Sequence, residues 1–206
     1  MALEKSFFRQ VMGRFTTGVT VVTTRHNELL GGLTVNAFCS VSLDPPLVLV
    51  CVDLHSQTLP LIRGGKNFAV NMLTEQQQDL SNCFSTTTPE RLNYFSHAPY
   101  HTAATGAPIL DQTLAFIDAR VVAEYPGGDH AIFLGQVEAM GNGTRTMYAN
   151  PEGSNHHVTF TEVSQNGTNA HNEPEPLLYY LGQYRELGSI QPKPSLTGIA
   201  HEDGAK

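Results

Sequence analysis

The sequence predicts a mainly β fold, a β-barrel with a few peripheral helices, and two observations support this. Short β-branched and apolar runs recur along most of the 206 residues, separated by turns rich in glycine, proline and asparagine. Helical periodicity is limited to a few short segments between these runs. Many short strands with few helices can bury their apolar faces by curving into a barrel.

The N-terminal half of the chain is expected to open with a helix and continue as strands. Leu3, Phe7, Val11 and Phe15 recur at helical spacing, which predicts an amphipathic helix. A short helix is expected over 56–62, because Ser56 can cap it. Prolines after Asp44 should end the strand over 33–42, since proline donates no ladder hydrogen bond. The strands are expected over 18–24, 33–42, 47–52 and 67–73.

The C-terminal half should add a helix from Thr74 to about Phe84 and strands over 113–124, 130–140 and 177–181. Residues 141–175 are rich in glycine, asparagine and histidine, which predicts a long loop or hairpin excursion. Residues 1–188 are therefore expected to form one domain. Residues 189–206 read as a polar C-terminal tail.

Composition and charge exclude several classes of partner. The chain is 40% hydrophobic, with a formal net charge of −7. Without a basic footprint, neither nucleic acid nor an anionic membrane is an expected partner. No apolar run reaches the roughly 18 residues that a membrane helix needs. The charged N-terminus is unlike a signal peptide, and the three cysteines have no metal-ligand spacing, so a reducing cytoplasm is the expected location.

Residues 33–62 contain the candidate ligand site. Small and hydroxyl residues interrupt an apolar strand pattern there, whereas a core strand favours bulky side chains. Such residues suggest a backbone that a flat ligand can approach. The turn that follows offers hydroxyls and amides before a helix, which suits an anionic phosphate. Residue types alone, however, favour an ordinary strand pair with a serine cap.

Three motifs in order resemble the flavin reductase-like proteins, which are FMN-binding split barrels. Thr34–Ser42, followed by Asp44-Pro45-Pro46 and Ser56–Thr58, resembles the family's first signature. Gly128-Asp129-His130 with the strand after it resembles the second, and Pro176–Tyr184 resembles the closing strand. The resemblance implies a split β-barrel of Greek-key FMN-binding type. The 141–175 segment is longer than the usual link in that family.

The resemblance also assigns roles to individual residues. It implies that small and polar residues of the first motif line the flavin, with amides from the 36–40 segment: Thr34, Asn36, Ala37, Phe38, Ser40 and Ser42. It places Asp53, Ser56 and Thr58 at or near the phosphate. Phe84 and Tyr184 are further candidates for contact with the ring, and the alternative for both is core or interface packing.

His130 is the candidate catalytic residue. As part of the second motif it would contact the nicotinamide or polarise the flavin–nicotinamide pair, and the alternative is a strand histidine bonded to backbone. His156, His157 and His171 lie in the 141–175 segment, which has no strong structural frame, so no metal site is expected.

The implied function is that of an NAD(P)H:flavin oxidoreductase, which transfers hydride from nicotinamide to FMN, with FAD as the alternative flavin. No G-x-G-x-x-G follows a strand, so NADH or NADPH would not be held by a Rossmann fold. By resemblance the protein forms a homodimer and supplies reduced flavin to a partner monooxygenase. The alternatives are an FMN-retaining electron carrier and a non-enzymatic nucleotide-binding barrel.

Overall fold

The computed structural model describes residues 4–86, 93–96, 99–143, 145–150, 159–164 and 174–187. Nine strands form one large sheet. They are β2 (Thr20–His26), β3 (Leu29–Val35), β4 (Phe38–Leu43), β5 (Pro46–Asp53), β6 (Asn67–Met72), β9 (Ala115–Gly127), β10 (His130–Gly141), β11 (Arg145–Ala149) and β12 (Phe160–Ser164). The prediction of a mainly β fold is confirmed.

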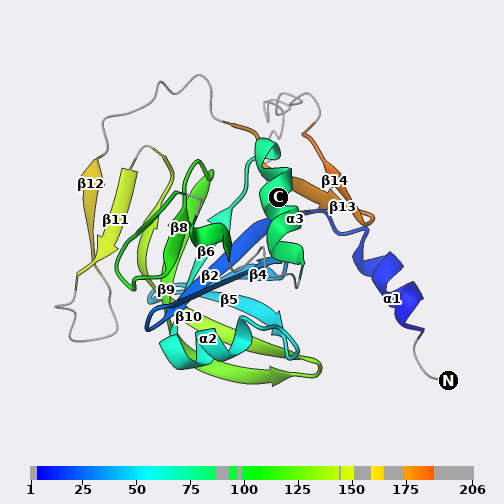
Figure 1. Cartoon of the computed structure of the whole chain (residues 1–206), viewed down its shortest axis with the longest axis horizontal. Coiled ribbons are helices and arrows are strands. Elements are labelled where there is room, and N and C mark those ends of the chain that lie inside the picture. Colours follow the sequence, from blue (N-terminus) through cyan, green and yellow to red (C-terminus); the bar gives the residue numbers. More distant parts are fainter. Residues whose placement is uncertain are drawn as a thin grey trace, which may run out of the picture.

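Smaller elements surround this sheet (Figure 1). β1 (Thr17–Gly18), β13 (Leu178–Tyr180) and β14 (Gln183–Arg185) form a second sheet, and β7 (Tyr100–Thr102) pairs with β8 (Pro108–Leu110). The helices are α1 (Lys5–Met12), α2 (Leu59–Gly65), the 3-10 turn η1 (Glu75–Gln77) and α3 (Gln78–Ser85). A capping box between Thr74 and Gln77 begins η1, as the sequence at Thr74 indicates.

The large sheet divides at β10. One edge of β10 pairs with β9, while the other pairs with β5 over 130–136 and with β11 over 139–141. A register shift between Val137 and Ala139 lies where the second edge changes partner. Hydrogen-bonded pairing does not join the two ends of the path β4-β5-β10-β9-β6-β2-β3 within the described residues. The sheet is therefore a split barrel, open along one seam.

The core lies on the concave side of this sheet. Val22, Val50, Phe68 and Phe133 are fully buried there, and they come from four different strands. Their positions follow the period-2 alternation of strands, because neighbours along each strand point to the opposite face. Burial of these side chains is the main driving force for curling the sheet.

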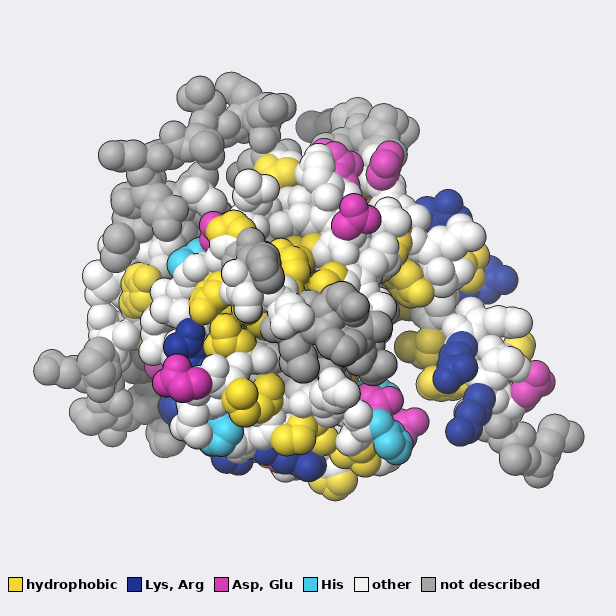
Figure 2. Space-filling view, viewed as in Figure 1, with side chains coloured by type: hydrophobic (Ala, Val, Ile, Leu, Met, Phe, Trp, Pro, Cys, Tyr) yellow, Lys and Arg dark blue, Asp and Glu magenta, His cyan; other side chains and the backbone are white. Residues whose placement is uncertain are grey.

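α1 contributes nothing to this core. It has no buried residue, and Phe7, Phe8, Val11 and Met12 are each half or more exposed. Figure 1 shows α1 at one end of the molecule and β11 and β12 at the opposite end. Figure 2, in the same view, shows hydrophobic and basic side chains together on the surface of α1. The helix is amphipathic, as its spacing predicts, but its apolar face is uncovered.

Two expectations need correction or completion. The run 33–42 is not one strand, because the chain leaves β3 after Val35 and starts β4 at Phe38. The 141–175 segment includes a strand pair, since β11 and β12 are antiparallel partners. Residues 144, 151–158 and 165–173 of that segment, and the tail 189–206, lie outside the described residues. The 1–188 domain boundary stays a prediction.

Candidate flavin site

The open seam of the barrel is at Asn36 and Ala37. These two exposed residues join β3 to β4, the two strands at the ends of the sheet path. The ladder continues past β4 through one bond, in which the Cys51 amide donates to the Ala37 carbonyl at 3.1 Å. Backbone at such a break is accessible to a ligand, because a neighbouring strand pairs with it on one side only. The sequence predicted this property for the same segment.

A pocket of about 620 Å³ lies against the seam, and we call it the large pocket. One wall comes from α1 and the residues after it: Phe8, Arg9, Met12, Phe15 and Thr17. The remaining lining comes from the seam and from β4 and β5: Asn36, Ala37, Phe38, Cys39, Leu49 and Cys51. Its volume is within the range of small-molecule sites, and its lining is mostly apolar with a few polar groups.

A second pocket, the adjoining pocket, continues from the first. It has a volume of about 390 Å³ and shares Phe15, Thr17, Asn36 and Phe38 with the large pocket. Thr17 therefore lies where the two meet. Its Oγ1 is buried and has no hydrogen-bond partner among the described residues. A buried hydroxyl without a partner is costly, so a polar ligand atom at this point would remove that cost.

His130 lies on the same outer sheet face as the large pocket. It is the register partner of Asp53, and Ile132 is the partner of Cys51, which lines the pocket. Residues opposite each other in an antiparallel pair point to the same face. Asp53 follows Cys51 by two positions, so His130 lies about 7 Å further along the strand direction. The structure thus brings His130 to the edge of the candidate site.

Two carboxylates accompany two histidines at this edge. His130 Nδ1 lies 2.8 Å from Asp129 Oδ1, and His55 Nδ1 lies 3.1 Å from Asp53 Oδ1. The His130 hydrogen bond lowers the pKa of the Asp129 carboxyl. Hydrogen bonds from the His55 backbone and side chain lower the pKa of Asp53. Both carboxylates are therefore ionised at neutral pH and lie within hydrogen-bond distance of the two imidazoles.

The expected phosphate turn is locally closed by its own hydrogen bonds. The Asp53 carboxylate accepts from the His55 amide at 2.7 Å, and Ser56 Oγ accepts from the Thr58 amide at 3.2 Å. Thr58 is buried and donates its hydroxyl to the Gly32 carbonyl at 3.0 Å. This hydroxyl bond anchors the start of α2 to β3. None of the three residues is in the described wall of the large pocket.

Thr34, Phe84 and Tyr184 form a separate packing unit around α3. Thr34 Oγ1 donates to the Ser81 carbonyl at 2.7 Å, and Tyr184 Oη lies 2.9 Å from Ser81 Oγ. Phe84 is 1% exposed, in a core cluster with Val19 and Leu73. The contacts of Phe84 and Tyr184 are thus those that the packing alternative predicts. Tyr179, which faces Tyr184 at a ring distance of 5.6 Å, lines the large pocket instead.

The other residues of the first motif lie either in the wall of the large pocket or further along β4. Asn36, Ala37 and Phe38 line the large pocket, whereas Ser40 and Ser42 follow on β4, exposed and half-buried, and are not in its wall. The sequence interpretation missed Thr17, Arg9, Leu49 and Cys51. The sequence carried no signal for Leu49 and Cys51, because they are apolar like the buried Val48, Val50 and Val52 with which they alternate.

Neither a metal-binding cluster nor a membrane-spanning helix occurs among the described residues. The described residues contain no group of three or more His, Cys, Asp or Glu side chains able to hold a metal ion. His156, His157 and His171 lie outside the described residues, so the expectation for them is untested. Within the described part of the chain, no helix has both the length and the apolar character to span a bilayer.

Comparisons with known proteins agree with this geometry. Residues 12–188 match the model of the flavin reductase like domain. The reductase subunit HsaB of a flavin-dependent monooxygenase from Mycobacterium tuberculosis (strain CDC 1551 / Oshkosh) is 32% identical over 97% of this chain and 88% of its own length. The NADH-dependent FMN reductase AsuE2 from Streptomyces nodosus subsp. asukaensis is 38% identical over 65% of this chain and 72% of its own.

Solved structures give the same result. The flavin reductase PheA2 in its native state has a TM-score of 0.70 and 32% identity, over 90% of this chain and 99% of its own. The NADH:FAD oxidoreductase SgcE6 of Streptomyces globisporus, solved with NAD and FAD fragments, has a TM-score of 0.70 and 28% identity, over 90% and 94%. The chain therefore belongs to the flavin reductase-like family, as its motifs predict.

Proposed function

We propose that this protein is an NAD(P)H:flavin oxidoreductase that supplies reduced flavin to a partner monooxygenase. The observation that carries the proposal is the large pocket at the open seam, in a chain whose family and relatives are flavin reductases. Several of these relatives are named as reductase components of monooxygenases, which supports a monooxygenase as the partner.

The residues of the large pocket fit a flavin. Its apolar walls suit a planar ring, and the seam backbone at Asn36-Ala37 offers amide and carbonyl groups to a pyrimidine edge. Thr17 Oγ1 has no hydrogen-bond partner in the part of the chain that the structure describes, so it is available to a polar ring atom. Arg9 adds a cation to the wall of an otherwise acidic protein, which suits a phosphate.

FMN with NADH is the proposed pair. One relative is named an NADH-dependent FMN reductase, and one neighbour was solved with NAD and FAD fragments, so FAD stays the alternative. The two cofactors themselves supply the hydride chemistry. The chain's contribution is to hold both rings and to exclude water between them. His130 is proposed to position the nicotinamide, with its ring fixed by Asp129.

A homodimer is proposed as the working form. Support comes from α1, whose apolar side chains are largely exposed although they border the large pocket. A second copy that covers this face would bury apolar area and shield the site. Sedimentation equilibrium of the full chain tests this, and a monomer at all concentrations would contradict it. A cytoplasmic location stays a prediction.

The decisive experiment is NADH and NADPH oxidation by the purified protein, with and without FMN, FAD and riboflavin, next to its visible spectrum. Turnover that depends on added flavin supports a reductase that releases its product. A yellow protein that retains FMN but does not oxidise nicotinamides would favour an electron carrier. No spectral change with any flavin would contradict both.

A further inference from the structure

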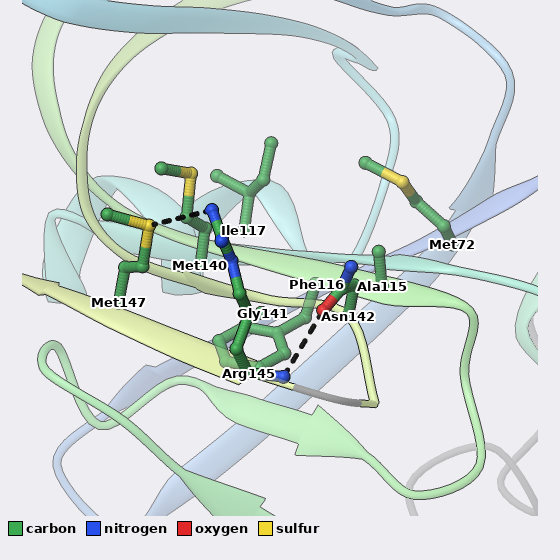
Figure 3. Close-up of a pocket in the computed structure, with 9 residues that line it drawn as sticks. All are labelled: Met72, Ala115, Phe116, Ile117, Met140, Gly141, Asn142, Arg145 and Met147. Carbon is green, nitrogen blue, oxygen red and sulfur yellow. Dashed lines mark hydrogen bonds between the residues drawn. The ribbon is translucent and has the colours of Figure 1, made fainter. Parts of the chain in front are cut away.

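A separate cleft of about 280 Å³ lies where β6, β9 and the turn between β10 and β11 meet. We call it the methionine cleft, because Met72, Met140 and Met147 line it together with Phe116, Ile117 and Arg145. Figure 3 shows the Arg145 side chain extending from the turn toward Met147, with Met140 and Ile117 on the same side. The volume is close to the lower limit of about 300 Å³ for small-molecule sites.

The methionine cleft is distinct from the flavin site. It has no lining residue in common with the large pocket, and it shares only Met72 with the adjoining pocket. Arg145 and Met147 belong to β11, which contributes no residue to the lining of the large or the adjoining pocket. The cleft is therefore a different site from the large pocket, with Met72 as its one residue in common with the adjoining pocket.

The lining combines soft apolar groups with one cation. Thioethers adapt their shape and make favourable contacts with aromatic rings, and the Phe116 ring adds a flat apolar surface. Arg145 brings a guanidinium to this apolar surface. A site with this combination favours a flat apolar body that carries one negative charge.

The guanidinium retains donors for an incoming anion. Arg145 Nη2 lies 3.8 Å from the Met147 sulfur, and Nη1 lies 3.8 Å from Glu162 Oε2. The second distance is longer than a hydrogen bond, and 56% of the Arg145 side chain is exposed. A carboxylate in the cleft could therefore make a close two-point contact that Glu162 does not make.

We propose that the methionine cleft binds a small aromatic carboxylate. The ring would lie among the thioethers and Phe116, and the carboxylate would pair with Arg145. Glu162 would compete only weakly for the guanidinium, because its carboxylate lies 3.8 Å away. The site therefore favours a monoanion whose carboxylate approaches Arg145 more closely than Glu162 does.

Methionine methyl NMR offers a direct test with the full chain. Three of the five methionines line the cleft, while Met12 lines the large pocket. Benzoate is the probe, benzamide is its neutral isostere, and acetate carries the charge without the ring. We expect benzoate to shift the Met140 and Met147 methyl signals saturably, with a dissociation constant of about 1 mM or tighter. Benzamide and acetate should bind at least tenfold more weakly.

Two variants separate charge from packing. Arg145→Gln should weaken benzoate binding about tenfold or more, and Glu162→Gln should leave it equal or tighter. Equal binding of benzamide, an unchanged affinity in Arg145→Gln, or no saturable shift would overturn the proposal. Met140 and Met147 signals that depend on protein concentration would also overturn it, since a second copy would then occupy the cleft. FMN titration followed at Met12 reports the proposed flavin site separately.

Discussion

His130 and Asp53 are register partners at the end of the β5–β10 pairing, and each side chain lies within hydrogen-bond distance of a neighbour in its own strand or turn. His130 contacts Asp129, and Asp53 contacts His55. The two histidines therefore have similar immediate chemistry but different exposure. The His130 side chain is 39% exposed, whereas that of His55 is 92% exposed. The less exposed His130 is therefore the better candidate for positioning a bound ring.

This difference provides a matched pair of variants. His130→Asn should lower kcat/KM for NADH about tenfold, because a positioned imidazole contributes roughly 1.4 kcal/mol to binding and orienting the nicotinamide. His55→Asn, the control, should leave kcat/KM within about twofold. Steady-state kinetics at saturating FMN would check both. Equal losses in the two variants would remove the proposed role of His130.

Replacing Thr17 should change the stability of the fold and the affinity for FMN in opposite directions. Thr17→Val removes a buried hydroxyl that no described residue hydrogen-bonds, so the free energy of unfolding should stay equal or rise. FMN affinity should fall about fivefold, because the ligand loses a hydrogen bond worth roughly 1 kcal/mol. Urea unfolding and fluorescence titration measure the two quantities. Thr102→Val on exposed β7 is the control. Unchanged FMN affinity would mean that the flavin does not use this hydroxyl.

Arg9 should discriminate flavins by their phosphate. If it pairs with the FMN phosphate, Arg9→Gln should raise KM for FMN roughly tenfold and leave KM for riboflavin unchanged. Lys5→Gln, at the start of the same helix, is the control for a general loss of positive charge. An equal effect on FMN and riboflavin would place the phosphate elsewhere, with the Ser56 turn as the remaining candidate.

Tyr184 should matter for stability and not for flavin. Its hydroxyl contacts Ser81 Oγ at 2.9 Å and donates to Asn82 Oδ1 at 3.1 Å. Tyr184→Phe should therefore lower the free energy of unfolding by about 1 kcal/mol, while KM for FMN stays the same. Tyr125→Phe, at an exposed position, is the control. A raised KM for FMN with unchanged stability would instead indicate that Tyr184 contacts the flavin.

Asp118 gives the protein a pH-dependent stability. It is fully buried on β9 and accepts the Thr105 amide at 2.8 Å as well as the Thr105 hydroxyl. Burial raises the pKa of its carboxyl above the value in the unfolded chain. Its contribution is thus complete below the unfolded pKa of about 3.9 and is lost as the pH rises through the folded pKa.

The Asp118→Asn variant should lose this pH dependence. The urea midpoint of the wild type minus that of Asp118→Asn should fall as the pH rises above about 4. Exposed Asp79 on α3 supplies the control variant Asp79→Asn, whose difference from wild type should stay nearly flat. A difference that grows with pH would show that the bonds from Thr105 outweigh burial.

Strand positions and an accessible backbone within residues 33–62 were predictable from the sequence, whereas the break between two strands at Asn36-Ala37 was not. β-branched runs give most strands within a few residues, because local side-chain patterns dominate there. The break at Asn36-Ala37 is set by which strands meet across the barrel, and the continuous pattern of 33–42 hides it. The unbroken apolar run of β5 likewise concealed that one of its faces is a pocket wall.

Hydroxyl residues were the least predictable part of the site. Thr34 and Thr58 bond to carbonyls distant in sequence, so their hydroxyls are already used. Thr17, which has no such partner, lies just before the run that predicted a strand. Which hydroxyl is available depends on long-range contacts, and residue type alone carries no information about these.

α1 also has a consequence for the thermodynamics of binding. An eight-residue helix with no buried side chain is marginal by itself in water. Phe8 and Met12 of this helix line the large pocket, so an occupant would cover apolar surface that the free chain leaves hydrated. Flavin binding should then show a negative heat-capacity change larger than the ring alone explains, because helix formation and binding would occur together.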